Sequence, residues 1–334
     1  MAQPAGGMNG EMVQTRNLGP WAVSPIGLGC MPLSQNRESR PELLTDRDLS
    51  ISVIHAGLDA GINFLDTADI YAPSWRDFGH NEKLVGEAFR SWNGSPEQKS
   101  QIVIATKAGI TRGPNESWGR ASSRDYFLRA AEASALRLGV EKIQLWQHHR
   151  MNPEMPFDTQ FRNVLVLLER GLVEQIGLSN VNLEQLKLAV EIGGTPLEGG
   201  VISVQNEYSP RYRLGSDVLE YCQSQGIAFL PWSPLGGVGR SSGIADGKFG
   251  LFSELSQEKN CSPYSLAIAW LLRQSTTIIP IPGASRREQI ADLVAGWSLD
   301  LSDAELTRLN SNLPENPPLH PELVDQPLLR ALGV

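Results

Sequence analysis

The segment Gly61-Ile-Asn-Phe-Leu-Asp66 connects the end of a predicted helix to a short apolar strand. The helix is expected over residues 46–60, with Asp46 as its N-cap and Gly61 as the residue that ends it. The strand Asn63–Asp66 has the apolar pair Phe64-Leu65 at its centre and ends at an acid. A helix followed directly by a buried strand is the repeating unit of an α/β fold.

The same unit recurs along the chain. Seven further apolar runs predict strands, at Val23–Gly29, Ile102–Thr106, Ile143–Gln147, Glu174–Leu178, Val201–Gln205, Ala228–Trp232 and Thr277–Ile281. Helical periodicity is expected between them, over 80–92, 122–138, 158–170, 183–192, 216–225, 263–274 and 286–295, with Ser122 and Ser262 as N-caps. Eight alternations favour a closed (β/α)8 TIM barrel, and an open doubly wound sheet is the alternative.

The segment after the first strand argues against the open sheet. A dinucleotide-binding sheet places Gly-x-Gly-x-x-Gly there, whereas this chain has Gly27-Leu-Gly29-Cys30-Met31-Pro32, with proline at the third glycine position. We therefore expect a single-domain barrel over residues 13–312, after a flexible N-terminus at 1–12. A Pro-rich C-terminal tail at 313–334 is expected near the active-site face, which long C-terminal-face loops such as Gly236–Leu255 also shape.

Composition narrows the functional classes. The chain has 29 basic and 37 acidic residues and a net charge of −8, which argues against nucleic-acid binding. The three cysteines, Cys30, Cys222 and Cys261, form no C-x-x-C pair, as is typical of a reducing compartment. We find no secretory signal and no apolar run long enough to span a membrane, and so expect a cytoplasmic protein. The oligomeric state is left open.

Ionisable residues occur at the ends of three successive predicted strands. Asp66 ends the second strand and Tyr71 follows it by five residues, Lys107 ends the third strand, and His148 and His149 end the fourth. Each alone is an ordinary cap or surface residue, but a barrel gathers these strand ends into one cleft.

The chemistry of these groups is that of carbonyl reduction. A carbonyl that accepts hydride needs a proton, which a tyrosine can donate if a nearby cation lowers its pKa. Lys107 is expected to be that cation, Asp66 to hold its ammonium, and a histidine to orient the carbonyl. A metal site is not expected, because Asp66 and His149 lack a compact spacing and a third ligand.

These motifs resemble those of the aldo-keto reductase superfamily, from about Val23 to about Asp292. The resemblance is carried by Gly61-Ile-Asn-Phe-Leu-Asp66-Thr-Ala-Asp-Ile-Tyr71, Thr106-Lys107, Leu145-Trp-Gln-His-His149-Arg150 and Gly171-Leu-Val-Glu-Gln-Ile-Gly-Leu-Ser179-Asn180. It implies a catalytic tetrad of Asp66, Tyr71, Lys107 and His149. Whether His148 shares the role of His149 is left open.

The resemblance also implies an NADP(H) site. Ser179, Asn180 and Gln205 suit a nicotinamide carboxamide, and the ring of Tyr208 is expected against the nicotinamide plane. Arg286 and Arg287 open a helix and favour a 2′-phosphate, although which of the two contacts it is open. The full set of expected cofactor contacts is Gly29, Met31, Ser179, Asn180, Gln205, Tyr208, Trp232, Ser233, Pro234, Leu235, Gly237, Gly283, Ser285, Arg286, Arg287, Gln289 and Asp292.

The expected activity is NADPH-dependent reduction of a small aldehyde or ketone, with Tyr71 as the acid. Trp75, Trp118 and Arg150 are candidate substrate contacts, and Arg120, Arg150 and Arg211 favour an anionic or polyhydroxylated substrate unless they are surface ion-pair partners. Two alternatives are a cofactor-binding regulatory subunit, like the potassium-channel β subunits of the same superfamily, and a dehydrogenase that works in the reverse direction.

Overall fold

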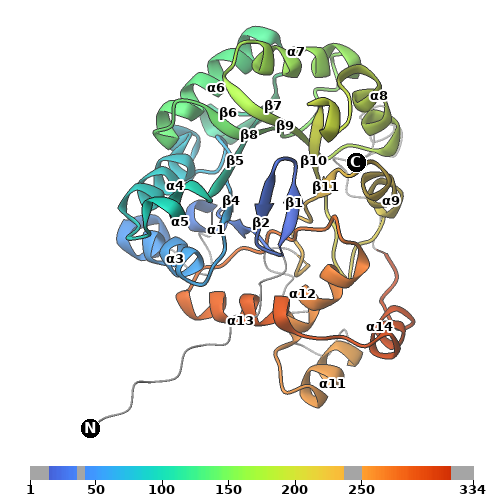
Figure 1. The fold of residues 1–334 in the computed structure, drawn as a ribbon. Coiled ribbons are helices and arrows are strands. Elements are labelled where there is room, and N and C mark those ends of the chain that lie inside the picture. The colour runs from blue at the N-terminus through green and yellow to red at the C-terminus, as the bar shows by residue number, and fades with distance from the viewer. Residues whose placement is uncertain (1–14, 36–41, 237–249, 317–334) are drawn as a thin grey trace.

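The computed structural model describes residues 15–35, 42–236 and 250–316, and it shows a TIM barrel (Figure 1). Seven strands form a parallel sheet in the order β11-β10-β9-β8-β5-β4-β3. Their bounds are β3 (Leu28–Gly29), β4 (Phe64–Asp66), β5 (Val103–Ala108), β8 (Ile143–His148), β9 (Val173–Ser179), β10 (Val201–Gln205) and β11 (Ala228–Phe229).

The segment 277–283 closes the barrel between β11 and β3, as the predicted eighth strand should. Parallel bridges join Ile278 to Phe229 and Gly283 to Gly29. The N–H of Gly29 donates to the Pro282 carbonyl at 3.0 Å, and a Cβ at Gly29 would lie 2.7 Å from the Ile281 carbonyl oxygen. The segment forms no regular strand because prolines 280 and 282 have no N–H to donate.

Eight helices cover the outside of this sheet where helices are predicted (Figure 1). They are α3 (Arg47–Asp59), α4 (His80–Ser91), α6 (Arg124–Leu138), α7 (Phe157–Glu169), α8 (Leu183–Gly193), α9 (Ser216–Gln225), α12 (Pro263–Gln274) and α13 (Arg287–Ser298). Asp46 and Ser262 cap α3 and α12 as predicted. The cap of α6 is Ser123 rather than Ser122, because the Ser122 hydroxyl is hydrogen-bonded to His148.

A hairpin of β1 (Arg16–Leu18) and β2 (Trp21–Val23) lies across the barrel opening in Figure 1. The predicted first strand, Val23–Gly29, is therefore wrong at its start: Pro25 interrupts it, and Val23 belongs to the hairpin. Leu18 and Val23 are fully buried in a cluster with inward-facing strand residues such as Phe64, Leu145 and Ile202. The hairpin thus closes the end of the barrel that lies opposite the functional strand ends.

The structure also contains several short helices and strands outside the eight strand–helix units. A second hairpin, β6 (Ile110–Gly113) and β7 (Ser117–Arg120), follows β5 and was not predicted from the sequence. The others are α1 (Pro32–Gln35), α2 (Glu42–Thr45), α5 (Pro96–Ser100), α11 (Gly250–Glu258), α14 (Asp303–Asn310), η1 (Trp75–Asp77), η2 (Pro114–Glu116) and η3 (Pro196–Glu198). The expected flexible N-terminus 1–12 and most of the tail 313–334 lie outside the described residues.

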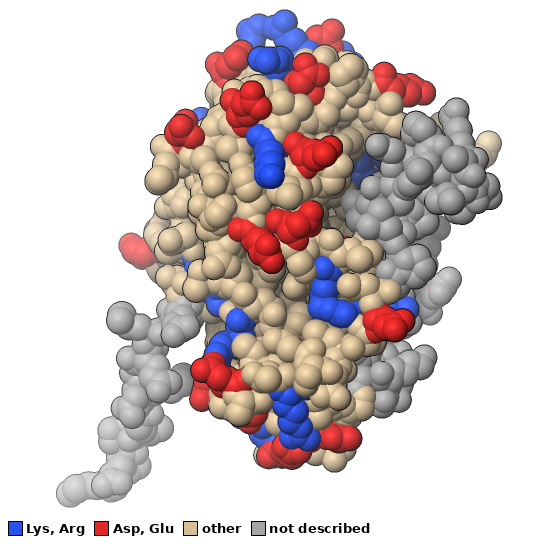
Figure 2. Space-filling view, turned by 90° about the vertical axis from the view of Figure 1, so that its right-hand side faces the viewer, with Lys and Arg blue, Asp and Glu red and all other residues tan. Residues whose placement is uncertain are grey.

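Acidic and basic side chains are interspersed on the face shown in Figure 2, with tan surface between them. Among the described residues, no helix combines the length and apolarity needed to cross a membrane. In the same residues, no cluster of three or more His, Cys, Asp or Glu side chains is placed to hold a metal ion.

We expect Leu18→Ala to destabilise the protein by about 2–5 kcal/mol, because it opens a cavity where the hairpin fills the barrel. Leu197→Ala is the matched control: this leucine is 97% exposed, so its change should stay within about 0.5 kcal/mol. Urea unfolding of both variants measures the difference. Equal stability of the two variants would contradict the closing role of the hairpin.

Candidate active site

Strand register and side-chain alternation bring the predicted residues to one end of the barrel. Asp66 pairs with Ala105, and Lys107 lies two residues further along β5, so both side chains face the barrel interior. Lys107 in turn pairs with Gln147, and Gln205 pairs with Ser179. The carboxyl ends of β4, β5, β8, β9 and β10 therefore surround one site.

A buried ion pair lies at the centre of this site. The Lys107 ammonium is fully buried, and it donates to Asp66 Oδ1 at 2.6 Å, to the Thr67 carbonyl at 2.7 Å and to Tyr71 Oη at 3.3 Å. Burial alone would lower the pKa of Lys107, but Asp66 and Tyr71 hold the pKa above its usual value. The ammonium is therefore charged, and each of its three N–H donors has an oxygen acceptor.

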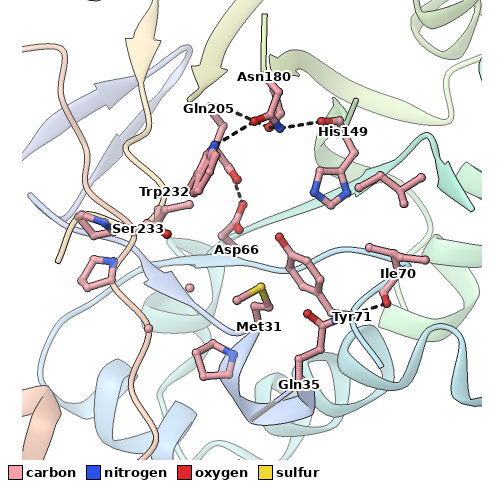
Figure 3. Close-up of a pocket in the computed structure, with 18 of the residues that line it drawn as sticks. Met31, Gln35, Asp66, Ile70, Tyr71, His149, Asn180, Gln205, Trp232 and Ser233 are labelled. Carbon is pink, nitrogen blue, oxygen red and sulfur yellow. Dashed lines mark hydrogen bonds between the residues drawn. The ribbon is translucent and has the colours of Figure 1, made fainter. Parts of the chain in front are cut away.

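The other carboxylate oxygen of Asp66 is also hydrogen-bonded. Asp66 Oδ2 accepts from Gln205 Nε2 at 2.8 Å and from Gln147 Nε2 at 3.4 Å (Figure 3 draws the Gln205 bond). Gln205 was predicted as a carboxamide ligand, but in the structure its amide nitrogen is bound to Asp66. Gln147 was not predicted at all, although its position in β8, two residues before His149, indicates the same inward face.

Tyr71 is partly buried, and its hydroxyl points toward Asp66 and the ring of His149 (Figure 3). Burial raises the pKa of Tyr71, and the nearby Lys107 ammonium lowers it by less. The expected lowering by the lysine is present, but it does not decide the net direction. At neutral pH the phenol therefore keeps its proton.

The structure separates the two histidines. His149 lies in the cavity, with its ring 5.7 Å from the Tyr71 ring in an edge-on arrangement. His148 faces away from the barrel interior: its Nε2 is hydrogen-bonded to Ser122 Oγ at 3.1 Å and its ring packs against Phe127. Because successive residues of a strand face opposite sides, only one of the two can reach the cavity.

Both imidazoles are neutral in this environment. Burial lowers the pKa of His148 to about 3. The pKa of His149 falls well below its usual value through burial and through the nearby charges of Lys107, Arg150 and Arg120. A neutral His149 retains one N–H donor that it can offer to an oxygen in the cavity.

These residues open into a cavity of about 660 Å³. Its lining includes most of the predicted contacts: Gly29, Met31, Asp66, Tyr71, Trp118, His149, Arg150, Ser179, Asn180, Gln205, Trp232, Ser233, Pro234, Leu235, Gly283, Ser285 and Gln289. Arg120, one of the three arginines considered for an anionic substrate, also lines it. Other residues that line it were not among the predicted contacts: Pro32, Gln35, Ile70, Ile110, Ile281, Pro282 and Ala284. Their loops could be assigned to this end of the barrel, but their side-chain directions depend on loop conformation.

Asn180 connects three strand ends on one side of the cavity (Figure 3). Its Nδ2 donates to the His149 carbonyl at 3.0 Å and to Ser179 Oγ at 2.9 Å, and its Oδ1 accepts from Trp232 Nε1 at 3.2 Å. The backbone of Asn180 is left-handed, with φ of 59°, which asparagine tolerates better than most residues. The bond to Asn180 fixes the indole of Trp232 at the cavity wall.

Tyr208 is placed differently from the prediction. Its side chain is 5% exposed, and its ring packs against Phe229 and Trp270 instead of lining the cavity. Trp232, in the loop after β11, places an indole ring at the cavity wall instead. The expected stacking of Tyr208 on a nicotinamide is therefore wrong, because this residue lies beyond the inward-facing end of β10.

Four other predicted contacts lie outside the lining of the cavity. Trp75 lies in η1 with the Arg76 guanidinium 4.7 Å from its ring centroid. Arg286 and Arg287 are exposed at the start of α13, and Asp292 accepts a hydrogen bond from Ser265 at 2.7 Å. Gly237 falls outside the described residues.

Comparison with known proteins identifies relatives of this chain. A description of the aldo/keto reductase family matches residues 25–313. An uncharacterized oxidoreductase of Schizosaccharomyces pombe is 31% identical over 298 residues, covering 89% of both chains. A probable aldo-keto reductase of Glycine max is 28% identical over 334 residues, covering 92% of this chain and 91% of the relative.

Solved structures share the fold. An aldo-keto reductase from Klebsiella pneumoniae in complex with NADPH superimposes with a TM-score of 0.72 at 22% identity, covering 92% of this chain and 97% of that one. A thermostable aldo-keto reductase in complex with epalrestat also gives 0.72, at 23% identity, covering 89% and 99%.

We expect the Tyr71 phenol to titrate above its ordinary pKa of 10.0, because burial outweighs the effect of Lys107. The absorbance difference between wild type and Tyr71→Phe, followed with pH, isolates this one tyrosine. Lys107→Met should move the midpoint higher still, whereas Lys142→Met, which removes an exposed charge, should not move it. A midpoint below 10 in the wild type would contradict the expectation.

Proposed function

The chain belongs to the aldo/keto reductase family, and we propose that it reduces a small aldehyde or ketone to an alcohol with NADPH. Tyr71 is the proton donor in this proposal. The observation that carries it is the contact of a buried, charged Lys107 with the Tyr71 hydroxyl oxygen at 3.3 Å.

This contact determines which way the phenol proton can go. Lys107 donates to Tyr71 Oη, so the hydroxyl oxygen acts as an acceptor on that side and its own hydrogen is available to the cavity. As the proton leaves, the phenolate that forms is stabilised by the ammonium. Asp66 acts through Lys107, because it holds the ammonium in place by an ion pair at 2.6 Å.

His149 supplies the second polar contact to the carbonyl oxygen. Its neutral ring lies edge-on to Tyr71 at the cavity wall, so one N–H can be directed to the same oxygen that receives the proton. The two groups together orient the carbonyl and stabilise the negative charge that develops on it.

The polar and aromatic groups that line the cavity suit an NADP(H) cofactor. Ser179 Oγ and Asn180 Oδ1 each keep a lone pair that can accept from the nicotinamide carboxamide, and Trp232 offers a flat ring held by Asn180. When bound, the reduced nicotinamide supplies the hydride. Ser233 and Pro234 in the loop after β11 line the part of the cavity that we assign to the pyrophosphate.

The 2′-phosphate is assigned to the start of α13. Ser285 and Gln289 line the cavity there, and Arg286 and Arg287 are exposed beside them. The helix N-terminus and two guanidinium groups favour an anion at this position. This grouping supports NADPH over NADH.

We expect Tyr71→Phe to lower kcat for aldehyde reduction about 10²–10⁴-fold, because it removes a positioned acid. The loss of NADPH absorbance with a panel of aldehydes measures turnover, and NADPH fluorescence measures binding, which should remain. Tyr221→Phe is the control, since this partly exposed tyrosine of α9 contacts Lys187 and does not line the cavity.

Turnover by Tyr71→Phe equal to that of the wild type would contradict the proposed mechanism. A wild type that binds NADPH but reduces none of the aldehydes would support the regulatory cofactor-binding subunit instead.

A further inference from the structure

Two arginines line the wall of the cavity beside His149. Arg150 follows His149 directly after β8, and Arg120 ends β7, where it pairs with Ile110 of β6. Both are partly buried. Arg211, the third arginine considered for an anionic substrate, does not line the cavity.

The charged side chains of the lining are mostly arginines. Among the described residues that line the cavity, the charged side chains are Arg120, Arg150 and the carboxylate of Asp66. That carboxylate already forms an ion pair with Lys107, and His149 is neutral. Both guanidinium groups contribute to the low pKa of His149, and Arg150 offsets a small part of the rise in the pKa of Tyr71, so their charge acts at the place where the carbonyl is reduced.

This cationic wall is separate from the part of the cavity assigned to the cofactor phosphates. Figure 3 shows Trp232 and Ser233 on one side of Asp66 and His149 on the other. The arginines are on the His149 side, because Arg150 is its neighbour in sequence and Arg120 acts on its charge state. A phosphate held at Ser233 or Ser285 would therefore lie apart from these arginines.

The β6–β7 hairpin adds an aromatic surface to this wall. Trp118 lines the cavity and is nevertheless 57% exposed, with the Arg112 guanidinium 4.9 Å from its ring centroid. Arg112 also donates to the Ala72 carbonyl at 2.8 Å and is paired with Glu116. Because Ala72 follows Tyr71, this arginine fixes the hairpin, with Trp118, relative to the acid.

We propose that the substrate is a carbonyl compound that carries an oxyanion, which Arg120 and Arg150 bind while its apolar part lies against Trp118 and Ile110. This inference rests on the proposed function of the same cavity. A guanidinium group binds carboxylate and phosphate oxygens in paired, charge-assisted hydrogen bonds. An aromatic ring at the rim suits a flat or apolar frame between carbonyl and anion.

Three aldehydes on one frame test the inference: 4-carboxybenzaldehyde, 4-formylphenyl phosphate and methyl 4-formylbenzoate, which is neutral. We expect the wild type to favour at least one anion over the ester by about tenfold or more in kcat/KM. The preferred anion distinguishes a carboxylate from a phosphate substrate. Equal kcat/KM for all three would overturn the inference.

Variants assign the preference to the arginines. Arg120→Met and Arg150→Met should each lower the anion-to-ester ratio of kcat/KM by about tenfold. Arg150→Lys, which keeps the charge, should retain part of the anion-to-ester ratio. This result would show that the loss in Arg150→Met does not come from a folding defect. Arg211→Met is the matched control and should leave the ratio at its wild-type value. An unchanged ratio in both Met variants would refute the assignment.

The outcomes separate this inference from the proposed function. If the wild type reduces the ester but shows no anion preference, the inference fails and the reductase function stands. If it reduces none of the aldehydes, calorimetry tests the inference instead. It compares the binding of 4-(hydroxymethyl)benzoate with that of its methyl ester to the NADPH-loaded protein. Tighter binding of the anion that is lost in Arg150→Met supports the inference, and equal binding overturns it.

Discussion

The ammonium of Lys107 has no contact with solvent, and its three donors meet Asp66, the Thr67 carbonyl and Tyr71. A charge in this position is stable only while its partners remain, and removing one member of a buried ion pair typically costs about 3–5 kcal/mol. The two amides on Asp66 satisfy the second carboxylate oxygen, so the network is complete on both sides. The pair joins the carboxyl ends of β4 and β5 and contacts the hydroxyl of Tyr71.

The loop that carries Tyr71 is fixed by further buried hydrogen bonds. Thr67 Oγ1 donates to Asn81 Oδ1 at 2.6 Å, and Asn81 Nδ2 donates to the Cys30 carbonyl at 2.8 Å. The N–H of Asn81 donates to the Tyr71 carbonyl at 3.1 Å, so α4 is anchored to both the loop and the first barrel loop. A proton donor held in this way needs little reorganisation when charge develops on the substrate.

Much of this site follows from the sequence. The order of strands and helices and the strand-terminal positions of Asp66, Lys107 and Gln205 were all predictable from apolar periodicity. The choice between His148 and His149 could also be predicted, because Leu145 and Gln147 share a strand face with His149. Side-chain alternation in β8 is the signal that decides it.

Other features depend on tertiary contacts that a sequence pattern does not reveal. Ser122 and Ser123 are equal candidates as a helix cap until His148 is seen to take the hydroxyl of Ser122. Likewise, the burial of Tyr208 depends on how the loop after β10 packs against Phe229 and α12. The hairpin β6–β7 lacks the short turn that marks a hairpin in sequence, since η2 connects its strands.

Asp66 acts on Tyr71 mainly by holding the Lys107 ammonium in place, and a double-mutant cycle on kcat measures this coupling. Asp66→Asn, Lys107→Met and the double variant are compared with the wild type in aldehyde reduction, with folding checked by circular dichroism. We expect the double variant to be no slower than Lys107→Met alone, because both changes remove the same contact to the phenol. Losses that multiply in the double variant would contradict this expectation.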